Sequence, residues 1–598
     1  MGEGEKGVNN TLSNSSNKAY RPKYGFFYII TLPALLLVFI FKVIPAVMAL
    51  ILPFKNYNVA AGMQSPWVGS SNFDKLLSGY HFTRVVGNTI MIRLEYLIIA
   101  SLVALVLSIT LSMVRNKKIR NLFSAIFVAP YFIPAVIISY LVMIIFSTKS
   151  PIFEFATPPL VNPATFRIIY VLVEVARNVG IPTIIAAASI EGHIRRFPHR
   201  KDFLSSRLIP VLKALAAFIF IQFSVILTVD SEVLSMLINP LVYQVADTLG
   251  TYAYRAGFAQ SAFSLNATLW LIRIVIQTVL VLGSYFVIRY FLRDSLFTGV
   301  TDDEKGNIDN VSHNNDGSSN DDKEGIMGKS KEAYGFRDNP LSYVLCTVFA
   351  LFALFPFIFM IVQGFFKSDS TGGLSQLLGN SPIIKSFALY FTVTLVAVIF
   401  NAFITVTLAY PLTAPRLPGK AVYKLMLLLL VSLGTGGIHE YLFNRSLGTI
   451  NTIFPLITGG LFSFINVFVI KSIFNSKHQS LMEEAFYSGK RGAYIFANIY
   501  LPRVWKPLLG LAVLQFVTMW NSFTSSVTYM SNPLYFSPTA LFRNITVISY
   551  GSIDIRGIDI TSPAVMKLAI LITLPSILLF VIFRKFLTSE VFISQTRQ

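Results

Sequence analysis

Runs of about 20 apolar residues recur along nearly the whole chain, and they constrain its fold more than any other feature. A helix of that length crosses the hydrocarbon core of a bilayer. Lipid offers the backbone no hydrogen-bond partner, so such runs are expected to be helices. Strand-like alternation is absent from the sequence, which argues against a β-barrel. With 54% hydrophobic residues in 598, the chain is predicted to be an all-α polytopic membrane protein.

The order of apolar and polar stretches predicts about 12 transmembrane helices in two repeats of six. A cytoplasmic tail at 1–23 precedes a first half at 24–295, and a second half occupies 341–598. Between the halves, 296–340 is polar, acidic and poor in aromatic residues, so it is predicted to be a flexible linker. The crossings are expected at about 25–52, 86–113, 121–147, 165–190, 209–237, 267–293, 341–366, 385–412, 423–440, 451–474, 508–531 and 562–584.

The formal net charge of +20 is explained by topology. Most lysines and arginines lie in short loops between apolar runs, as is typical of cytoplasmic loops of membrane proteins. The distribution argues against a nucleic-acid partner and predicts that both termini are cytoplasmic. The chain's single cysteine, Cys346, lies within an apolar run, which excludes an internal disulfide and a cysteine-based metal site.

The two halves repeat each other by spacing. Gln515-Phe516 is followed, 17 residues beyond the glutamine, by Asn532-Pro533. In the first half, Gln222-Phe223 is followed at the same distance of 17 residues by Asn239-Pro240. Leu501-Pro502 precedes the second glutamine by about the distance at which Ile209-Pro210 precedes the first. Three features in register indicate a tandem duplication.

A polar loop between two late apolar runs reads Glu483-Glu484-Ala485-Phe486-Tyr487-Ser488-Gly489 and continues to Ile499-Tyr500-Leu501-Pro502. It resembles the EAA loop, E-A-A-x3-G-x9-I-x-L-P, through which permeases of binding-protein-dependent ABC importers dock on their ATPase. The spacing is intact, although Glu484 and Ser488 replace the usual alanine and aspartate. The corresponding first-half loop, with Glu191 and Gly192, is degenerate. The resemblance implies that Glu483, Glu484, Ala485, Gly489, Ile499, Leu501 and Pro502, with Glu191 and Gly192, form ATPase-coupling loops.

Further segments resemble the paired permeases of polysaccharide and complex-oligosaccharide importers. They include Phe41–Pro45, Ser65–Gly69 and Asp247–Gly257 in the first half, and Trp520-Asn521-Ser522-Phe523 in the second. Those permeases are usually separate chains, so this one resembles a fusion of both. One departure from the permease pattern is that Val393-Thr394-Leu395, in the second half, lacks the asparagine that the first half has at Asn88.

The resemblance implies the type I ABC importer permease fold and import of oligosaccharides by alternating access across a bacterial cytoplasmic membrane. It implies a transporter subunit without catalytic residues, metal site or cofactor of its own. The implied partners are two cytoplasmic ABC ATPase subunits, which bind ATP and Mg, an extracellular sugar-binding lipoprotein and membrane lipid.

Candidate pathway residues are Trp520, Asn521, Gln515, Gln222 and Thr228. An aromatic face and amides suit sugar rings and hydroxyls, but helix packing with an interhelical hydrogen bond explains Trp520 and Asn521 equally well. Ionisable residues within crossings usually face a cavity or one another. Those in this sequence are Glu95, Glu174, Arg177, Asp230, Glu232 and Arg273.

Two other classes of membrane protein remain as alternatives. A secondary, ion-coupled transporter also uses repeats and midplane sites, but should carry coupling carboxylates and no EAA spacing. A polytopic membrane enzyme should carry a carboxylate-rich catalytic loop, and none is visible. Gly328-Lys329-Ser330 is not a nucleotide-binding loop, because Lys323 stands where the first glycine is needed.

Overall fold

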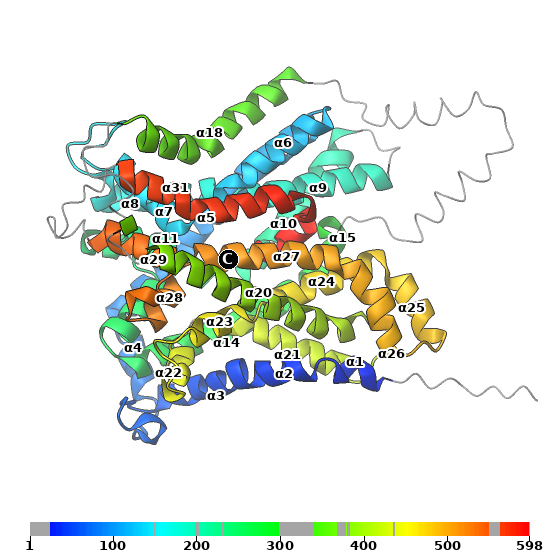
Figure 1. Ribbon diagram of the computed structural model, residues 1–598, viewed down its shortest axis with the longest axis horizontal. Coiled ribbons are helices and arrows are strands. Elements are labelled where there is room, and N and C mark those ends of the chain that lie inside the picture. Colours follow the sequence, from blue (N-terminus) through cyan, green and yellow to red (C-terminus); the bar gives the residue numbers. More distant parts are fainter. Residues whose placement is uncertain are drawn as a thin grey trace, which may run out of the picture.

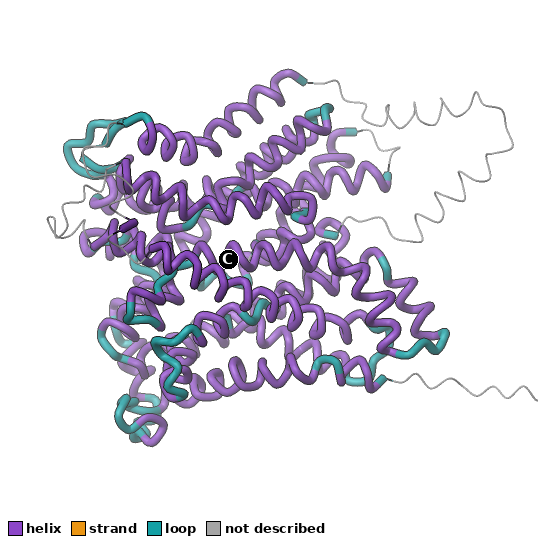
Figure 2. The backbone as a smooth tube through the Cα atoms, in the orientation of Figure 1, coloured by secondary structure: helices purple, strands orange, loops and turns teal. Residues whose placement is uncertain are grey.

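The computed structural model describes residues 24–148, 150–197, 202–228, 231–297, 339–367, 378–379, 383–434, 437–548 and 563–596. The predicted tail at 1–23 and nearly all of the predicted linker at 296–340 lie outside the described residues. Helices make up almost all of the described chain and run mostly along its long axis (Figures 1 and 2). Turns and loops connect the helices, and the β-structure among the described residues is one isolated bridge between Lys55 and Trp67. The expected all-α architecture is confirmed.

Within the described residues, eight helices are long and apolar enough to cross a membrane, and three bent pairs raise the number to as many as 11. The eight are Gly25–Phe54, His81–Ser112, Leu204–Phe223, Phe263–Leu296, Pro340–Phe365, Ile383–Thr413, Phe454–Lys477 and Pro563–Phe586. The pairs are Lys117–Phe132 with Ala135–Ile145, Pro163–Asn178 with Gly180–Arg196, and Lys420–Leu433 with Ile438–Ser446.

These segments account for all the expected crossings except that at 508–531, where the structure has α27 (Leu501–Asn521) and the short α28 (Thr524–Tyr529). The expected continuous helix at 209–237 is wrong. It ends at Phe223 as α10 (Ile209–Phe223), and a separate α11 (Ser231–Leu237) follows. In each half, the crossing that follows the predicted coupling loop is therefore built from two helices and not from one.

Bends and widened turns occur where proline or glycine permits them. Proline cannot donate the i→i−4 hydrogen bond, so the preceding turn can widen to a π-helix. This happens in η1 (Phe39–Val43), η6 (Leu204–Leu208) and η10 (Ile495–Tyr500), each of which ends just before a proline-containing turn. The 47° bend between α8 (Pro163–Asn178) and α9 (Gly180–Arg196) lies at Gly180. A Cβ there would come within 2.1 Å of the Phe127 carbonyl oxygen, so only glycine fits.

The duplication is visible in local structure. In both halves a π-helix, η6 or η10, leads into a helix whose second residue is proline, α10 or α27. Downstream, Asn239 Oδ1 accepts from the Leu241 amide at 3.1 Å, and Asn532 Oδ1 accepts from the Leu534 amide at 3.0 Å. Each of these asparagines caps a short 3-10 helix. The register derived from sequence spacing is the register of the structure.

The halves exchange their first helices. The first span, comprising α1 (Gly25–Ile29), α2 (Leu32–Val38) and α3 (Ile44–Ile51), packs on the second half. There the Phe27 ring stacks on Tyr410 with centroids 4.6 Å apart. Reciprocally, α18 (Pro340–Phe365) packs on α6 (Lys117–Val128) of the first half, where Phe349 meets Phe127 at 4.9 Å (Figure 1). Each half therefore holds the other, and the space between them is enclosed by helices of both.

Candidate functional site

The loop that resembles the EAA loop folds as two helical segments packed against each other. The first is α25 (Gln479–Tyr487), and the second runs through α26 (Gly492–Tyr494) and η10. Ala485 is buried between them, whereas Glu484, Leu501 and Pro502 are exposed. Gly489, at the turn, has a φ of +79°, a conformation that favours glycine.

The remaining members of the predicted coupling set lie close by. The Glu483 side chain accepts a hydrogen bond from Gln479 at 2.8 Å, and Ile499 is half-buried. The Tyr410 hydroxyl donates to the Gly492 carbonyl at 2.8 Å, which fixes the second segment. The loop thus presents a carboxylate and the Leu-Pro pair on a rigid support. The end of the helix bundle that carries it is called the coupling end below.

The first-half equivalents are placed differently. Glu191 and Gly192 lie near the end of the long α9, where Gly192 is buried. The Glu191 carboxylate is 2.6 Å from an Arg195 guanidinium nitrogen and 3.6 Å from one of Arg120. This carboxylate is therefore committed to neighbouring arginines of its own half, unlike that of Glu484.

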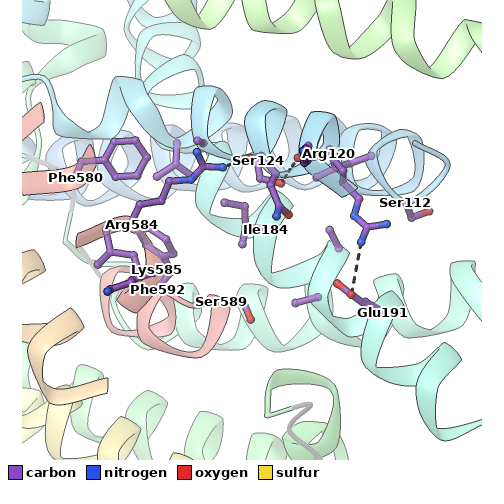
Figure 3. Close-up of a pocket in the computed structure, with 18 of the residues that line it drawn as sticks. Ser112, Arg120, Ser124, Ile184, Glu191, Phe580, Arg584, Lys585, Ser589 and Phe592 are labelled. Carbon is purple, nitrogen blue, oxygen red and sulfur yellow. Dashed lines mark hydrogen bonds and ion pairs between the residues drawn. The ribbon is translucent and has the colours of Figure 1, made fainter. Parts of the chain in front are cut away.

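A cavity of about 760 Å³ lies between the halves at the coupling end. The side chains of Arg120 and Glu191 form one wall (Figure 3). Arg584 and Lys585, at the end of the last span, and Phe592, beyond it, face them from the second half (Figure 3). The eroded first-half loop therefore borders a basic cavity between the halves.

Two further cavities lie deeper between the halves. The far cavity, of about 430 Å³, is close to α22 (Ile438–Ser446) and α28, at the opposite end from the coupling loop (Figure 1). The central cavity, of about 410 Å³, is lined by α14 (Phe263–Val287) and the turn that follows α10 in the first half, and by α27 and its neighbours in the second. Thr228 and Arg273 line both cavities.

Two of the predicted pathway residues, Gln515 and Thr228, line the central cavity. Gln515 also donates to the Gly460 carbonyl at 3.1 Å. Sequence reasoning missed their neighbours Gln277, Thr518, Ser522 and Ser525. Gln277 lies four residues after Arg273, hence on the same helical face, and that spacing was the signal that could have found it.

Gln222 lies apart from Gln515, in a small cavity of about 40 Å³ that Gln595 and Thr596 also line. Its Oε1 atom is buried and has no hydrogen-bond partner among the described residues. The chain reaches this place through α32 (Ser589–Phe592) and η14 (Ile593–Gln595), which turn back into the bundle so that Ser594, Gln595 and Thr596 are buried within it.

The C-terminal segment is held on both sides. The Tyr131 hydroxyl of the first half donates to Gln595 Oε1 at 2.5 Å. Lys477 Nζ of the second half is 2.5 Å from Glu590 Oε2. Ser594 lines the central cavity, while the next residue, Gln595, lines the Gln222 cavity. The segment therefore separates the two polar spaces.

Trp520 and Asn521 line none of these cavities. The Trp520 side chain is 1% exposed, and its Nε1 donates to the Ile572 carbonyl at 3.0 Å. Asn521 donates to the Phe132 carbonyl at 3.1 Å and accepts from the Ser576 hydroxyl at 2.7 Å. These are the contacts of helix packing, the alternative that the sequence left open. A substrate contact by either residue stays a prediction and would require the bundle to open beside α31 (Pro563–Phe583).

Most ionisable residues singled out in the crossings have partners. Glu95 lies 3.7 Å from Arg167. Glu232 of the first half accepts from the Ser522 hydroxyl at 2.5 Å and from the Thr524 hydroxyl at 2.7 Å, and so holds the break between α27 and α28. Asp230 lies outside the described residues. Arg273 makes no hydrogen bond or ion pair with any residue that the structure describes.

Comparison with known proteins finds relatives that are about half as long as this chain. No protein-family model matches the chain. The polygalacturonan/rhamnogalacturonan transport system permease protein YtcP of Bacillus subtilis is 23% identical over 265 residues, which are 41% of this chain and 93% of that protein. Permease protein YteP of the same system and organism is 22% identical over 297 residues, 46% of this chain and 90% of its own length. The chain is thus similar to permeases of a polysaccharide transport system.

Protein LplB of Bacillus subtilis is also similar to this chain, with 23% identity over 294 residues, 45% of this chain and 90% of LplB. Each of these three relatives is matched over 90% or more of its own length by less than half of this chain, as expected if two permeases are fused in one chain. A crystal structure of a bacterial ABC transporter involved in the import of alginate matches 45% of this chain and 96% of its own chain, with a TM-score of 0.38 and 23% identity.

Proposed function

We propose that this permease forms the complete membrane part of an ATP-driven oligosaccharide importer, with each half acting as one permease subunit. One observation carries the proposal: α27 begins in the exposed Leu501-Pro502 pair of the coupling loop and reaches the central cavity through Gln515 and Thr518. A movement imposed on the loop would therefore be transmitted along one continuous helix to the cavity.

The lining of the central cavity fits a carbohydrate. Amides and hydroxyls come from Gln277, Gln515, Thr518, Ser522 and Ser525, and aromatic rings from Tyr390, Phe462 and Phe464. Sugars present hydroxyls at their edges and apolar faces to aromatic rings, and sites for small molecules combine a few polar groups with apolar walls. The names of YtcP and YteP, both permeases of a polysaccharide transport system, agree with such a substrate.

The energy comes from partners. Two cytoplasmic ABC ATPase subunits bind ATP and Mg and engage the coupling end, chiefly through Glu483, Glu484, Gly489 and the Leu501-Pro502 pair. A sugar-binding lipoprotein delivers substrate at the far end, outside the cell. Both termini and the linker are then on the cytoplasmic side of the bacterial membrane, as the loop charges predict.

Alternating access requires the C-terminal segment to move. Ser594 and Gln595 lie between the central cavity and the coupling end in the present conformation. Closure of the ATPase pair, which displaces the loop at Glu484, would shift α27 and release this segment. The sugar then leaves on the cytoplasmic side.

The secondary-transporter alternative needs a carboxylate that binds the coupling ion near the substrate. Neither the far nor the central cavity has an aspartate or glutamate among its described lining residues. This absence of described carboxylates favours ATP-driven import.

The experiment is uptake of a labelled oligosaccharide into proteoliposomes that contain the permease, its ATPases and its binding protein. We expect uptake to require internal ATP and to persist when proton and sodium gradients are dissipated. The permease alone should neither hydrolyse ATP nor accumulate sugar. Uptake without ATP that collapses with an ion gradient would support the secondary transporter instead.

A further inference from the structure

We propose that Arg273 binds a carboxylate of the transported sugar, which makes the substrate an acidic, uronate-containing oligosaccharide. The proposal rests on the proposed import function and adds the class of sugar and the residue that selects it. Arg273 lies in α14, within the predicted span Phe263–Leu296, and is half-buried. Its side chain lines both the far and the central cavity, the two spaces that a sugar entering from the far end would cross in turn.

The guanidinium of Arg273 has no hydrogen-bond or ion-pair partner among the described residues. A charged group inside the membrane is costly and normally pairs with another group or faces a water-filled cavity. Retaining a cation here without an internal partner is explained if the partner arrives with the substrate.

Three acidic side chains on or beside the elements that line the far cavity are already engaged elsewhere. Asp247 Oδ2 is 2.6 Å from an Arg255 guanidinium nitrogen, and Glu440 Oε1 is 2.5 Å from Lys42 Nζ. Glu232 accepts from Ser522 and Thr524, as described above. None of these three acidic side chains is available to Arg273 without breaking a buried or part-buried contact, which would be unfavourable.

The far cavity, through which a sugar would reach Arg273, is also lined by positive charge. Arg255 and Arg543 line the far cavity together with Arg273, whereas its described lining has no acidic residue. Arg273 is the only charged residue in the described lining of the central cavity. A cavity lined by one sign of charge concentrates ligands of the opposite sign.

The surrounding side chains suit a sugar that bears a carboxylate. Trp270 lies one turn before Arg273 and Gln277 one turn after it, so all three share one face of α14. Trp270 lines the far cavity and Gln277 the central one. A guanidinium presents a planar fork of N–H donors that matches a carboxylate in two parallel hydrogen bonds. The Trp270 ring can pack on the face of a uronate ring, the Gln277 amide can bind its hydroxyls, and the Arg273 guanidinium can bind its carboxylate.

The test uses the complete reconstituted transporter and two probes, a galacturonate trisaccharide and its methyl ester, in which each negative carboxylate is replaced by a neutral, slightly larger ester group. We expect wild-type uptake of the acid to be at least as efficient as that of the ester. Arg273→Gln should reduce uptake of the acid roughly 10- to 100-fold, the range for losing a hydrogen bond to a charged group. It should change uptake of the ester less than about twofold, because an ester offers no negative charge to the guanidinium. Arg273→Lys should retain part of the acid uptake.

The controls separate the possible failures. Arg416→Gln, at an exposed arginine outside the cavities, should leave both uptakes unchanged. Equal losses of acid and ester uptake in Arg273→Gln would assign the residue a structural role and overturn the carboxylate site. Efficient wild-type uptake of the ester alone would overturn it too, while leaving sugar import intact. Absence of ATP-dependent uptake of both probes, together with no stimulation of ATP hydrolysis by the binding protein, would overturn the proposed function itself.

Discussion

Lys42, in the first span of the chain, forms an ion pair with Glu440 in the second half, with 2.5 Å between Nζ and Oε1. Their side chains are only 3% and 9% exposed. The pair joins residues almost 400 positions apart, 398 in the numbering of the chain, and fixes the exchanged first helix on the opposite half. The connection is therefore part of the framework around the cavities.

Breaking this pair from one side should destabilise the protein strongly. Removing one partner of a buried pair leaves an uncompensated charge, which costs about 3–5 kcal/mol. We expect Lys42→Met and Glu440→Gln each to lower the thermal unfolding temperature in detergent, and the double variant to recover most of the loss. Arg195→Gln is the matched control, because the Arg195–Glu191 pair is 61% and 35% exposed and such pairs contribute about 1 kcal/mol or less. Additive losses in the double variant would show that the two charges do not stabilise each other.

From the exchanged helices we also predict that the linker is not needed for the two halves to associate or to transport sugar. Phe27 and Phe349 pack in the half opposite to their own, so each half should capture the other without a covalent connection. Chains 1–316 and 317–598, co-expressed, should copurify through a tag on one half and support ATP-dependent uptake. Separation of the halves in mild detergent would mean that the linker holds them together.

Trp520 provides a test between packing and substrate contact. Its ring lies among Phe387, Tyr390, Phe391 and Phe516, with centroid distances of 5.5–6.2 Å. We expect Trp520→Ala to lower the free energy of unfolding by roughly 3–5 kcal/mol, as large-to-small changes in cores do. The surviving protein should keep its wild-type half-saturation for sugar, and Trp520→Phe should restore most of the stability. A raised half-saturation at normal stability would instead assign the ring to the substrate.

Local sequence signals predicted the framework well. The apolar runs placed nearly every span, and the Asn-Pro and Leu-Pro spacings gave the correct register of the repeat, because those pairs produce the same caps and π-turns in both halves. The exchange of first helices was not predictable in this way. It depends on contacts between residues hundreds of positions apart, such as Phe27 with Tyr410, and no local pattern encodes them.

The site was predicted only in part, for a related reason. α27 is surrounded by other helices, so its apolar pattern does not show which side faces a cavity, and Gln515 and Trp520 could not be distinguished from sequence. The structure directs Gln515 to the central cavity and Trp520 to the packing beside Ile572. The C-terminal Ser594-Gln595 is too polar and short to signal burial, yet Tyr131 holds it inside the bundle.

Coupling through the second-half loop is tested most directly by ATP hydrolysis of the reconstituted transporter carrying Gly489→Arg. Gly448→Arg is the matched control, because both glycines have a positive φ, +79° and +69°, but Gly448 lies in the loop after α22, away from the coupling end. We expect Gly489→Arg to assemble with its ATPases while losing both sugar uptake and the stimulation of ATP hydrolysis by the binding protein. Gly448→Arg should retain that stimulation. Normal stimulated hydrolysis and uptake in Gly489→Arg would contradict the assignment of this loop as the coupling element.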